Sequence, residues 1–407
     1  MTSQPQQTPR RLYLDNAATS FPKPPAVAGV MARFASGNGA SPRGRFAEAR
    51  EAAALVHRCR ERINALIGGE SPDHIVFTLN TTDALNLAIH GVLRPLLRAG
   101  RRPHVVTTWF DHNSVLRPCN ALAADGVEQT RVECDPATGL VDPEDVRRAI
   151  RPETALVAVN HASNVTGVVQ DVAAIGRICR EAGDHVLFLV DAAQSLGHLP
   201  VDVRAMNIDL LAFPGHKGLL GPTGTGGLYI RPGVESRVEP IRQGGTGTRS
   251  EHDVQPSMMP DRYESGSHNT VGIIGLSEGV AWLLERGIDA IRAHERELIA
   301  EFLDAAAEFP ESLRLLGPTD PDARVGVFSF VHDGLSPIEL ADGLERGYGI
   351  LTRAGLHCAP LAHRTIGTAP PEGAGAVRLS VGPFVTVEDI RYAARALREV
   401  AAAVRPA

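Results

Sequence analysis

The chain has 407 residues, of which 43% are apolar and 22% charged, and its formal net charge is −6. This composition is typical of a globular protein that is long enough for one large domain and one smaller domain. The negative charge argues against nucleic acid or an anionic membrane surface as a partner, and no apolar run approaches the roughly 20 residues of a membrane-spanning helix.

The cysteines are odd in number and scattered, without CxxC pairs. They are Cys59, Cys119, Cys134, Cys179 and Cys358. This usage predicts neither a disulfide framework nor a zinc site, and we expect no bound metal. The N-terminus MTSQPQQTPRR lacks the apolar core of a signal peptide. We therefore expect a cytoplasmic protein in which residues 1–11 form a disordered tail.

Short apolar runs alternate with amphipathic stretches over residues 12–284. Strands are predicted at 12–14, 74–77, 104–108, 127–132, 155–159, 186–190 and 208–213. Helices are predicted at 46–67, 84–93, 143–150, 172–182 and 275–285, and a further helix begins after residue 114. Such alternation is typical of a large α/β domain with a mainly parallel sheet and helices on both faces.

A smaller α+β domain is expected over residues 285–407, reached through a long amphipathic helix at 288–309. Roughly the first 15 residues of the large domain are expected to pack with it. Its predicted elements are a strand at 324–331, a helix at 337–345, a strand at 349–354, a loop at 355–375, a strand at 377–381 and a helix at 387–404. The polar loop 244–270 is long enough to favour a functional role.

Residues 186–230 place reactive side chains at the ends of two predicted strands. The strand 186–190 stops at Asp191, and the strand 208–213 is followed by His216 and Lys217. A carboxylate and a lysine at the ends of neighbouring buried strands lie where α/β sheets bind ligands. The Gly-rich stretch 218–227 that follows can fold the backbone closely around a small molecule.

Two other segments are candidate ligand sites. Thr81 and Thr82 lead into the predicted helix 84–93, and hydroxyls and free N–H groups at a helix start can bind a phosphate. A helix cap without a ligand explains that pattern equally well. His112 follows the predicted strand 104–108 and so lies on the ligand side of the sheet, although a lone histidine is also common on protein surfaces.

Together these groups match the needs of pyridoxal phosphate (PLP) chemistry. A lysine such as Lys217 must bond to the cofactor aldehyde, with its pKa lowered by burial or positive charge. A carboxylate such as Asp191 must keep the pyridine nitrogen protonated. Helix N-termini and hydroxyls must hold the phosphate, and an aromatic side chain, here His112, usually stacks on the ring.

The motifs DAAQ at 191–194 and GHK at 215–217 resemble those of the class V aminotransferase family of PLP enzymes, in particular its cysteine desulfurase and selenocysteine lyase branch of the SUF type. Further matching motifs lie, in the family's order, at 12–18, 80–86, 111–113, 161–164 and 263–267. The resemblance covers nearly the whole chain. It implies the PLP-dependent transferase fold of type I, with a seven-stranded sheet in the large domain.

The resemblance also implies roles around the cofactor ring. Lys217 would bind the cofactor covalently and later move the Cα proton of the substrate. Asp191 would pair with the pyridinium nitrogen, and Gln194 would donate to the phenolic oxygen. His112 would stack on the ring and act as acid or base, and Asn164 would be a further cofactor contact.

The phosphate and the substrate have their own implied contacts. Thr81, Thr82 and His216 would bind the phosphate. Ser267 matches a hydroxyl residue that reaches the phosphate of the neighbouring subunit, which implies a homodimer. Three residues would bind the substrate carboxylate, namely Asn164, Arg378 and Arg353. Arg378 would do so through a bidentate contact.

The segment 353–360, RAGLHCAP, resembles the R-x-G-x-H-C loop of SUF-type desulfurases, whose cysteine takes sulfur from the substrate as a persulfide. That attack needs an exposed, flexible cysteine near a cationic or hydrogen-bonding group, and His357 and Arg353 are the candidates. A buried structural cysteine is the commoner fate of a free thiol, but the flanking pattern favours Cys358 as nucleophile. The resemblance thus implies an L-cysteine desulfurase that passes sulfur to an acceptor protein.

Several alternatives stay open at this point. A selenocysteine lyase would use the same residues with L-selenocysteine as substrate. Another class V reaction, such as transamination, epimerisation or a different C–S cleavage, is compatible with the same fold and cofactor. A catalytically idle scaffold subunit is disfavoured by the retention of Lys217, Asp191 and Cys358. The segment 361–375 is longer than in the better-known members of the family and is a candidate for reshaping the entrance or an acceptor-docking surface.

Overall fold

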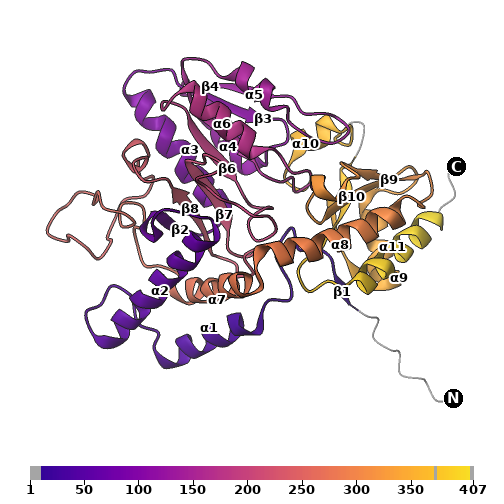
Figure 1. Ribbon diagram of the computed structural model, residues 1–407, viewed down its shortest axis with the longest axis horizontal. Helices are drawn as coiled ribbons and strands as arrows, with labels where there is room; N and C mark the ends of the chain where they lie inside the picture. Colours follow the sequence, from indigo (N-terminus) through magenta and orange to yellow (C-terminus); the bar gives the residue numbers. More distant parts are fainter. Residues whose placement is uncertain (1–10, 371–373, 404–407) are drawn as a thin grey trace.

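The computed structural model of the protein describes residues 11–370 and 374–403 and has a larger and a smaller sheet-bearing part (Figure 1). The strands of the larger sheet are β2 (Ile75–Thr78), β3 (His104–Thr108), β4 (Glu128–Val132), β5 (Thr154–Asn160), β6 (Leu187–Asp191), β7 (Leu210–Pro214) and β8 (Gly226–Ile230). Their order in space is β2-β8-β7-β6-β5-β3-β4. Strands β7, β6, β5, β3 and β4 run parallel, and β8 is antiparallel to both of its neighbours. The expected mainly parallel, seven-stranded sheet is confirmed.

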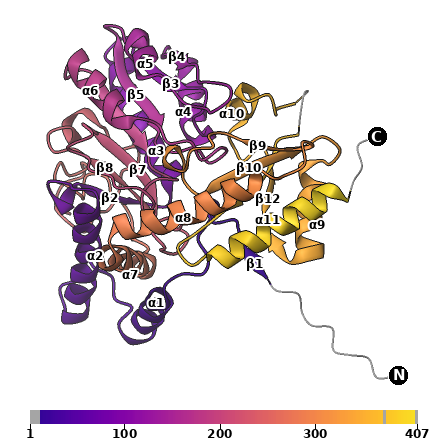
Figure 2. The ribbon, with the colours of Figure 1, turned by 45° about the vertical axis from the view of Figure 1, so that its right-hand side comes forward.

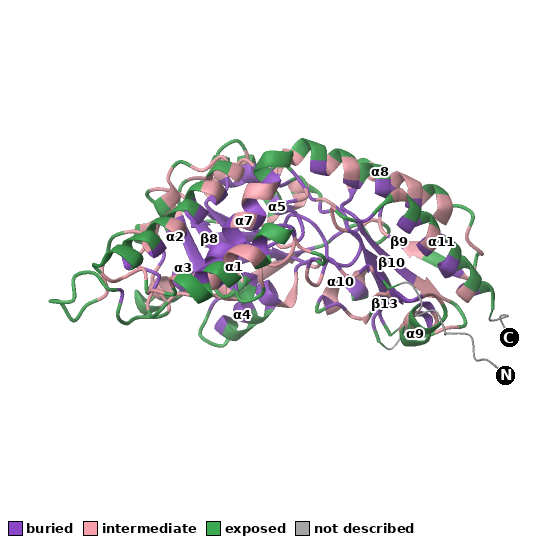
Figure 3. Ribbon diagram, turned by 90° about the horizontal axis from the view of Figure 1, so that it is seen from below, coloured by how far each residue is buried: buried purple, intermediate pink, exposed green. Residues whose placement is uncertain are grey.

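Helices cover both faces of this sheet. One face is covered by α3 (Thr81–Arg98) and α4 (Asn113–Ala123), and the other by α2 (Ala47–Leu66), α5 (Pro143–Ala149), α6 (Val172–Ala182) and α7 (Thr270–Arg286). In β6, Leu187 and Leu189 pack with α3, whereas Phe188 and Val190 pack with α2 and α6, as the alternation of side chains along a strand requires. Buried strands between exposed outer helices are visible in Figure 3. Burial on both faces explains why these strands are continuous apolar runs.

The smaller part contains a four-stranded antiparallel sheet in the order β12-β13-β10-β9. Its strands are β9 (Leu313–Leu316), β10 (Val327–His332), β12 (Arg353–Gly355) and β13 (Ala376–Ser380). Three helices pack on it, α8 (Ile288–Ala306), α9 (Pro337–Tyr348) and α11 (Val387–Ala402). Figure 2 shows α8 extending from the larger part to the smaller, with α11 beside it. The chain passes between the parts at Gly287, whose φ of 79° ends α7.

The N-terminal segment joins the smaller part. Strand β1 (Leu12–Tyr13) pairs in parallel with β11 (Ile350–Leu351). Leu12 and Leu14 are buried in the same apolar core as α8 and α11. Arg11, the last residue of the expected tail, forms an exposed ion pair with Glu345 of α9 at 3.1 Å. The rest of that predicted tail, residues 1–10, and the predicted helix end at 404 lie outside the described residues.

Within residues 11–370 and 374–403, four α-helices or strands are present where the sequence pattern predicts none. They are α1 (Pro25–Gly37), β8, β9 and the short helix α10 (Pro360–Thr365) inside the expected loop 355–375. The start of β8 corrects the expectation that residues 218–227 wrap a ligand. A Cβ on Gly226 would lie 2.8 Å from the backbone of Asn80, and one on Gly227 would lie 2.5 Å from the ring of Phe213. These two glycines therefore allow close strand packing.

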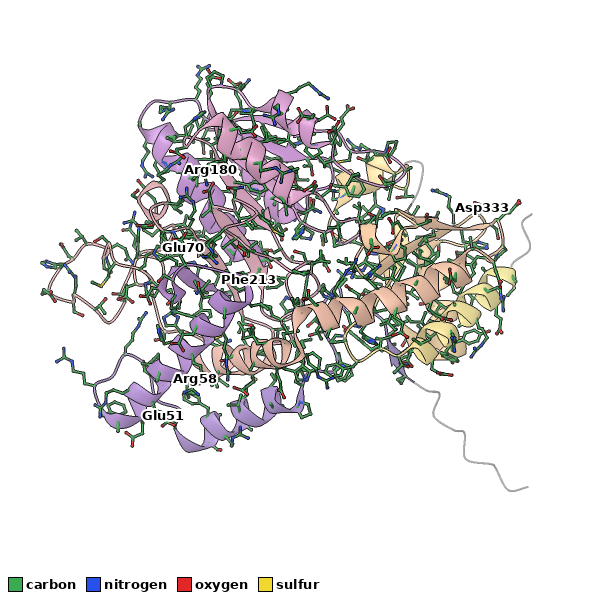
Figure 4. All side chains as sticks on the ribbon, viewed as in Figure 1. Glu51, Arg58, Glu70, Arg180, Phe213 and Asp333 are labelled. Carbon is green, nitrogen blue, oxygen red and sulfur yellow. The ribbon has the colours of Figure 1, made fainter. Side chains whose placement is uncertain are left out.

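Phe213 precedes the last residue of β7 and is fully buried. Figure 4 shows it within the larger part, whereas Asp333 lies at the outer side of the smaller part.

None of the helices in the described ranges combines the length and the apolar composition that crossing a bilayer requires.

Candidate active site

A pocket at the carboxyl ends of the parallel strands gathers most of the predicted site residues. It contains about 530 Å³ of empty space, part of which is open to solvent. The predicted residues in its lining are Thr81, Thr82, His112, Asn164, Asp191, Gln194, His216 and Lys217. This edge of a parallel sheet is where α/β proteins bind their ligands.

Asp191 and Lys217 supply opposite charges at the base of the pocket. Asp191 ends β6 and is 4% exposed, and its Oδ1 accepts a hydrogen bond from the backbone N–H of Ala193 at 2.9 Å. Burial raises the pKa of this carboxyl group, and Lys217 partly offsets that shift. Burial also lowers the pKa of the Lys217 amine to about 8, although Asp191 acts in the opposite direction. A substantial fraction of this amine is therefore uncharged and nucleophilic near neutral pH.

The N-terminal turn holds the peptide bond just before Lys217. The carbonyl oxygen of His216 accepts from the backbone N–H of Ser20 at 2.9 Å and from Thr19 Oγ1 at 3.0 Å. It also accepts from Ser20 Oγ at 3.2 Å and from Lys23 Nζ at 3.3 Å. Four donors on one carbonyl group fix the backbone from which the Lys217 side chain extends.

His112 is held in one orientation at the start of α4. Its Nδ1 accepts from the backbone N–H of Ser114 at 3.1 Å and lies 2.9 Å from Ser114 Oγ. Ser114 Oγ is in turn 2.8 Å from Thr82 Oγ1. Burial first, and then the charge of Lys217, lower the pKa of His112 to about 4. The ring is therefore neutral, with its proton on Nε2.

Two features of the pocket suit a phosphate group. Thr81 begins α3, whose N-cap Asn80 binds the N–H of Asp83 and leaves the first N–H groups of the helix for a ligand. Nδ1 of His216 is buried without a hydrogen-bond partner, and burial lowers the pKa of this histidine to about 4. A buried donor group without a partner costs free energy unless a ligand satisfies it.

Gln194 is oriented by the N-terminal turn as well. Its Nε2 donates to the carbonyl oxygen of Ala17 at 3.0 Å, which leaves the second N–H of the amide for a ligand in the pocket. Because the backbone N–H of Ala17 donates to Ser380 Oγ of β13, the position of Gln194 depends on a segment that also contacts the smaller part.

Arg378 and Arg353 form a cationic wall that is close enough to act on the charge of Lys217, although neither residue lines the pocket itself. They are directly paired in the register of β13 and β12, which places their side chains on the same side of the sheet. Arg378 is 3% exposed, and its guanidinium donates to Asp15 Oδ1 at 2.8 Å and to the carbonyl oxygen of Asn164 at 3.1 Å. Its Nε is buried without a partner. Two guanidinium groups and one carboxylate leave a net positive charge that favours an anionic ligand.

Cys358 is exposed, whereas the other four cysteines are buried. The carbonyl oxygen of Cys358 accepts from the backbone N–H of Asn113 at 3.0 Å, and that of His357 accepts from Asn164 Nδ2 at 2.6 Å. These bonds place the cysteine turn beside the start of α4 and therefore beside the pocket. The prediction that Cys358 is an accessible thiol near the site is consistent with this geometry.

His357 does not have the role that its position in the sequence suggests. Its ring is 5% exposed, with Nε2 at 3.3 Å from the carbonyl oxygen of Arg353 and Nδ1 at 3.2 Å from Nε2 of His363. Burial and the charge of Arg378 lower the pKa of His357 to about 2. The expectation that His357 assists the thiol is therefore wrong, because its ring is neutral and both nitrogens are engaged elsewhere.

Ser267 is not part of this pocket. It is exposed, and the segment that leads to it projects from the larger part, at the left of Figure 1. Next to it, Glu264 binds Arg60 through two hydrogen bonds of 2.7 and 2.5 Å and accepts from the backbone N–H of Phe77 at 2.7 Å. The base of the Ser267 segment is therefore firmly anchored.

Several residues at or near the site have no individual role in the sequence analysis, and three of them bind predicted site residues or their neighbours. Ser114 links Thr82 and His112, Asp15 pairs with Arg378, and His363 contacts His357. Ser114 was detectable, because a hydroxyl residue just after His112 fits a helix start. Asp15 reaches the site through a contact between distant segments, and the contact of His363 depends on the orientation of a ring. No local sequence pattern predicts either feature.

Residues 12–392 match the family model of aminotransferase class V. The chain belongs to this family. Class V enzymes adopt the PLP-dependent fold of type I, so the predicted fold class and family are confirmed. Members of the family use PLP as their cofactor.

Relatives in the class V family cover nearly the full length of the chain. A "probable cysteine desulfurase" of Methanothermobacter thermautotrophicus (strain Delta H) is 37% identical over 393 residues, which are 96% of this chain and 94% of the relative. The apo structure of cysteine desulfurase from Thermococcus onnurineus NA1 has a TM-score of 0.88 at 32% identity and covers 97% of this chain and 95% of its own. Cysteine desulfurase CsdA of Escherichia coli, solved in an S-sulfonic acid form, has a TM-score of 0.83 at 28% identity, with coverages of 97% and 95%.

Proposed function

We propose that this class V protein is a PLP-dependent cysteine desulfurase, which converts L-cysteine to L-alanine and receives the sulfur on Cys358 as a persulfide. The observation that carries the proposal is the hydrogen bond from the N–H of Asn113 to the carbonyl oxygen of Cys358. It joins the backbone of an exposed cysteine to the residue that follows His112, and His112 lines the pocket. The names of the relatives support the same activity.

The pocket fits PLP on the chemistry of its donors. Lys217 would hold the aldehyde carbon covalently, and the buried carboxylate of Asp191 would balance a protonated ring nitrogen. His216 and the start of α3, including Thr81 and Thr82, would bind the phosphate. Bound there, PLP supplies the electron sink for bond breaking at the substrate carbons.

The residues around the ring have complementary tasks. Gln194 would offer its free amide N–H to the phenolic oxygen, and the neutral His112 would stack on the ring with Nε2–H as its only donor. Asn164 donates one N–H of Nδ2 to the carbonyl oxygen of His357 and keeps its second N–H for a ligand in the pocket. A neutral His112 donates a hydrogen bond from Nε2, and it can act as an acid only after it has taken up a proton.

The substrate carboxylate would bind at the cationic wall of Arg378 and Arg353. The unpartnered Nε of Arg378 is available to it, and the second guanidinium neutralises the remaining charge. With the carboxylate fixed there, the uncharged amine of Lys217 removes the Cα proton. Its lowered pKa of about 8 makes it an effective base near neutral pH.

Sulfur transfer then uses the Cys358 thiolate. The thiolate attacks the substrate sulfur, a new S–S bond forms, and the Cβ–S bond breaks. The electron pair of the broken bond stays with the carbon skeleton, which takes up a proton and leaves as L-alanine. The thiol proton that Cys358 loses balances the proton gained by the product, and the enzyme retains one sulfur atom.

A homodimer and an acceptor protein complete the proposal. Ser267 is exposed, lies outside its own pocket and is held by the Arg60–Glu264 anchor, as expected for a hydroxyl that contacts the phosphate of a neighbouring subunit. The exposure of Cys358 allows its persulfide to reach an acceptor protein.

Mass spectrometry after brief exposure to L-cysteine tests this function. We expect a gain of one sulfur atom on the peptide that contains Cys358 and none on peptides with the four buried cysteines. The Cys358→Ala variant should retain the absorbance of bound PLP but release no alanine from L-cysteine. Alanine release from this variant at the wild-type rate would overturn the persulfide assignment. If the wild-type protein releases alanine from L-selenocysteine but not from L-cysteine, it is a selenocysteine lyase instead.

A further inference from the structure

Three polar side chains form a buried chain next to the Cys358 turn. His357, His363 and Thr368 are 5%, 0% and 3% exposed. The two imidazole rings lie 5.3 Å apart between centroids, with His357 Nδ1 at 3.2 Å from His363 Nε2. Nδ1 of His363 is 2.8 Å from Thr368 Oγ1. None of these three residues has a task in the proposed reaction.

The partners determine where the ring protons lie. The carbonyl oxygen of Arg353 can only accept, so Nε2 of His357 carries a proton and Nδ1 accepts. Nε2 of His363 therefore donates to His357, and Nδ1 of His363 accepts from the Thr368 hydroxyl. That hydroxyl also lies 3.4 Å from the carbonyl oxygen of His363, which is the longer of its two contacts. Both rings are neutral in this arrangement.

The backbone beside this chain is strained. His357 and Cys358 have φ values of 50° and 57°, in the left-handed region that residues other than glycine rarely adopt. Such residues persist only where the surroundings determine their conformation. The carbonyl bonds to Asn164 and Asn113 hold one side of the turn. The ring of His357 holds the other side, and that ring is oriented by His363.

We propose that His363 is a positioning residue for Cys358, which it holds in the left-handed turn beside the pocket through the ring of His357. The inference rests on the proposed role of Cys358 in sulfur transfer. It also assigns a task to residues 361–368 of the segment 361–375. Helix α10 supplies His363, and the chain returns so that the N–H of Thr368 binds the carbonyl oxygen of His363 at 2.8 Å.

The geometry excludes a proton relay as the task of these three buried side chains. The last acceptor of the chain that they form is the carbonyl oxygen of Arg353 and not the thiol of Cys358. A proton therefore has no route along it to or from the reacting sulfur. These hydrogen bonds fix the orientation of the His357 ring and, with it, the position of Cys358.

The test compares His363→Ala, His363→Gln and the control His104→Ala. The Gln amide retains an N–H that can reach Nδ1 of His357, so it should restore function. His104 is likewise fully buried between two threonine hydroxyls, of Thr154 and Thr130, but lies in β3 of the larger sheet. Its loss should reduce stability without affecting Cys358.

Three measurements are made on each PLP-loaded variant. They are the sulfur loading of Cys358 in a single turnover with L-cysteine, the KM for L-cysteine, and hydrogen exchange of the peptide 111–116. For His363→Ala we expect loading about tenfold slower and exchange at Asn113 about tenfold faster, the factor that loss of an ordinary hydrogen bond gives. KM and the cofactor absorbance should not change, and His363→Gln should recover most of the loading rate.

Loading and exchange at wild-type values in His363→Ala, with loading abolished in Cys358→Ala, would overturn the positioning role alone. Loading that persists in Cys358→Ala would instead overturn the proposed function. Should His363→Ala not fold, Thr368→Val removes only the hydroxyl donor to His363 and takes its place. A loading rate in Thr368→Val equal to that of the wild type would likewise overturn the inference.

Discussion

The backbone N–H of Asn113 donates to the carbonyl oxygen of Cys358 across a distance of 3.0 Å. Asn113 begins α4 on the larger sheet, whereas Cys358 follows β12 of the smaller sheet. The bond therefore sets the distance between an exposed thiol and a pocket that is built from the other part of the molecule. Any change in how the two parts meet alters the geometry of sulfur transfer.

Covalent uptake of PLP by the apo protein should become faster as the pH is raised towards about 8 and then level off. Only the uncharged amine of Lys217 attacks the aldehyde, and burial lowers its pKa to about 8. Rapid-mixing absorbance at a series of pH values measures the rate, with Lys217→Ala as the control that forms no bond. A rate that keeps rising up to pH 10.5, the ordinary pKa of lysine, would contradict the lowered value.

The same pKa shift predicts how the stability of the apo protein depends on pH. Between about 8 and 10.5 the unfolded chain binds more protons at Lys217 than the folded chain does. The free energy of unfolding should therefore rise with pH across this window. Urea unfolding of the apo protein and of Lys217→Ala should show the difference, because the variant lacks this contribution.

Replacing Asp191 by Asn should leave the fold intact and reduce turnover on the order of 10²- to 10³-fold, the range for removing a preorganised electrostatic partner. The amide has nearly the shape of the carboxylate but cannot balance a protonated ring nitrogen. Steady-state kinetics and the absorbance of bound PLP measure the effect. Asp209→Asn is the control, because Asp209 is also buried but pairs with Arg231 away from the pocket. Equal effects of the two changes would refute a cofactor role for Asp191.

Replacing Arg378 by Lys should raise KM for L-cysteine by about 10- to 100-fold, since a charged hydrogen bond and its fork geometry are lost. Arg353→Ala should raise KM only a few-fold, because Arg353 is exposed and water screens its charge. Arg346→Ala on the outside of α9 is the control and should leave KM unchanged. An Arg378→Lys variant with wild-type KM would place the substrate carboxylate elsewhere.

Replacing Glu264 by Gln should cost about 3–5 kcal/mol of the free energy of unfolding, because Arg60 then remains buried without its charge partner. The control is Asp342→Asn in the exposed Arg346–Asp342 pair, which should change stability by less than about 0.5 kcal/mol. Urea unfolding measures both. If the two variants lose the same amount of the free energy of unfolding, the Arg60–Glu264 ion pair stabilises the fold less than its burial indicates.

The sequence predicts well what short segments determine alone. Strand β6 is recognisable because Leu187–Val190 is apolar and ends at Asp191, and Lys217 follows a second such strand. Strand β8 is missed because Gly226 and Gly227 indicate a loop in isolation. Their role depends on the ring of Phe213 and the backbone of Asn80, which approach only in the folded sheet.

Contacts between distant segments limit the prediction of the site in the same way. The pairing of Asp15 with Arg378 and the donors of Ser20 and Thr19 to His216 join opposite ends of the chain. His357 shows a further limit. Its place before Cys358 suggests assistance to the thiol, but the direction in which its ring points is decided by His363.

The pairing of β1 with β11 sets the order in which the site is completed during protein synthesis. When a ribosome has made the whole seven-stranded sheet, residues 12–20 still lack their partners at Ile350 and Ser380. The turn that holds the carbonyl group of His216 therefore has no support from β11 or β13 until the last strands leave the exit tunnel. The pocket around Lys217 is therefore complete only after β11 and β13 have been synthesised.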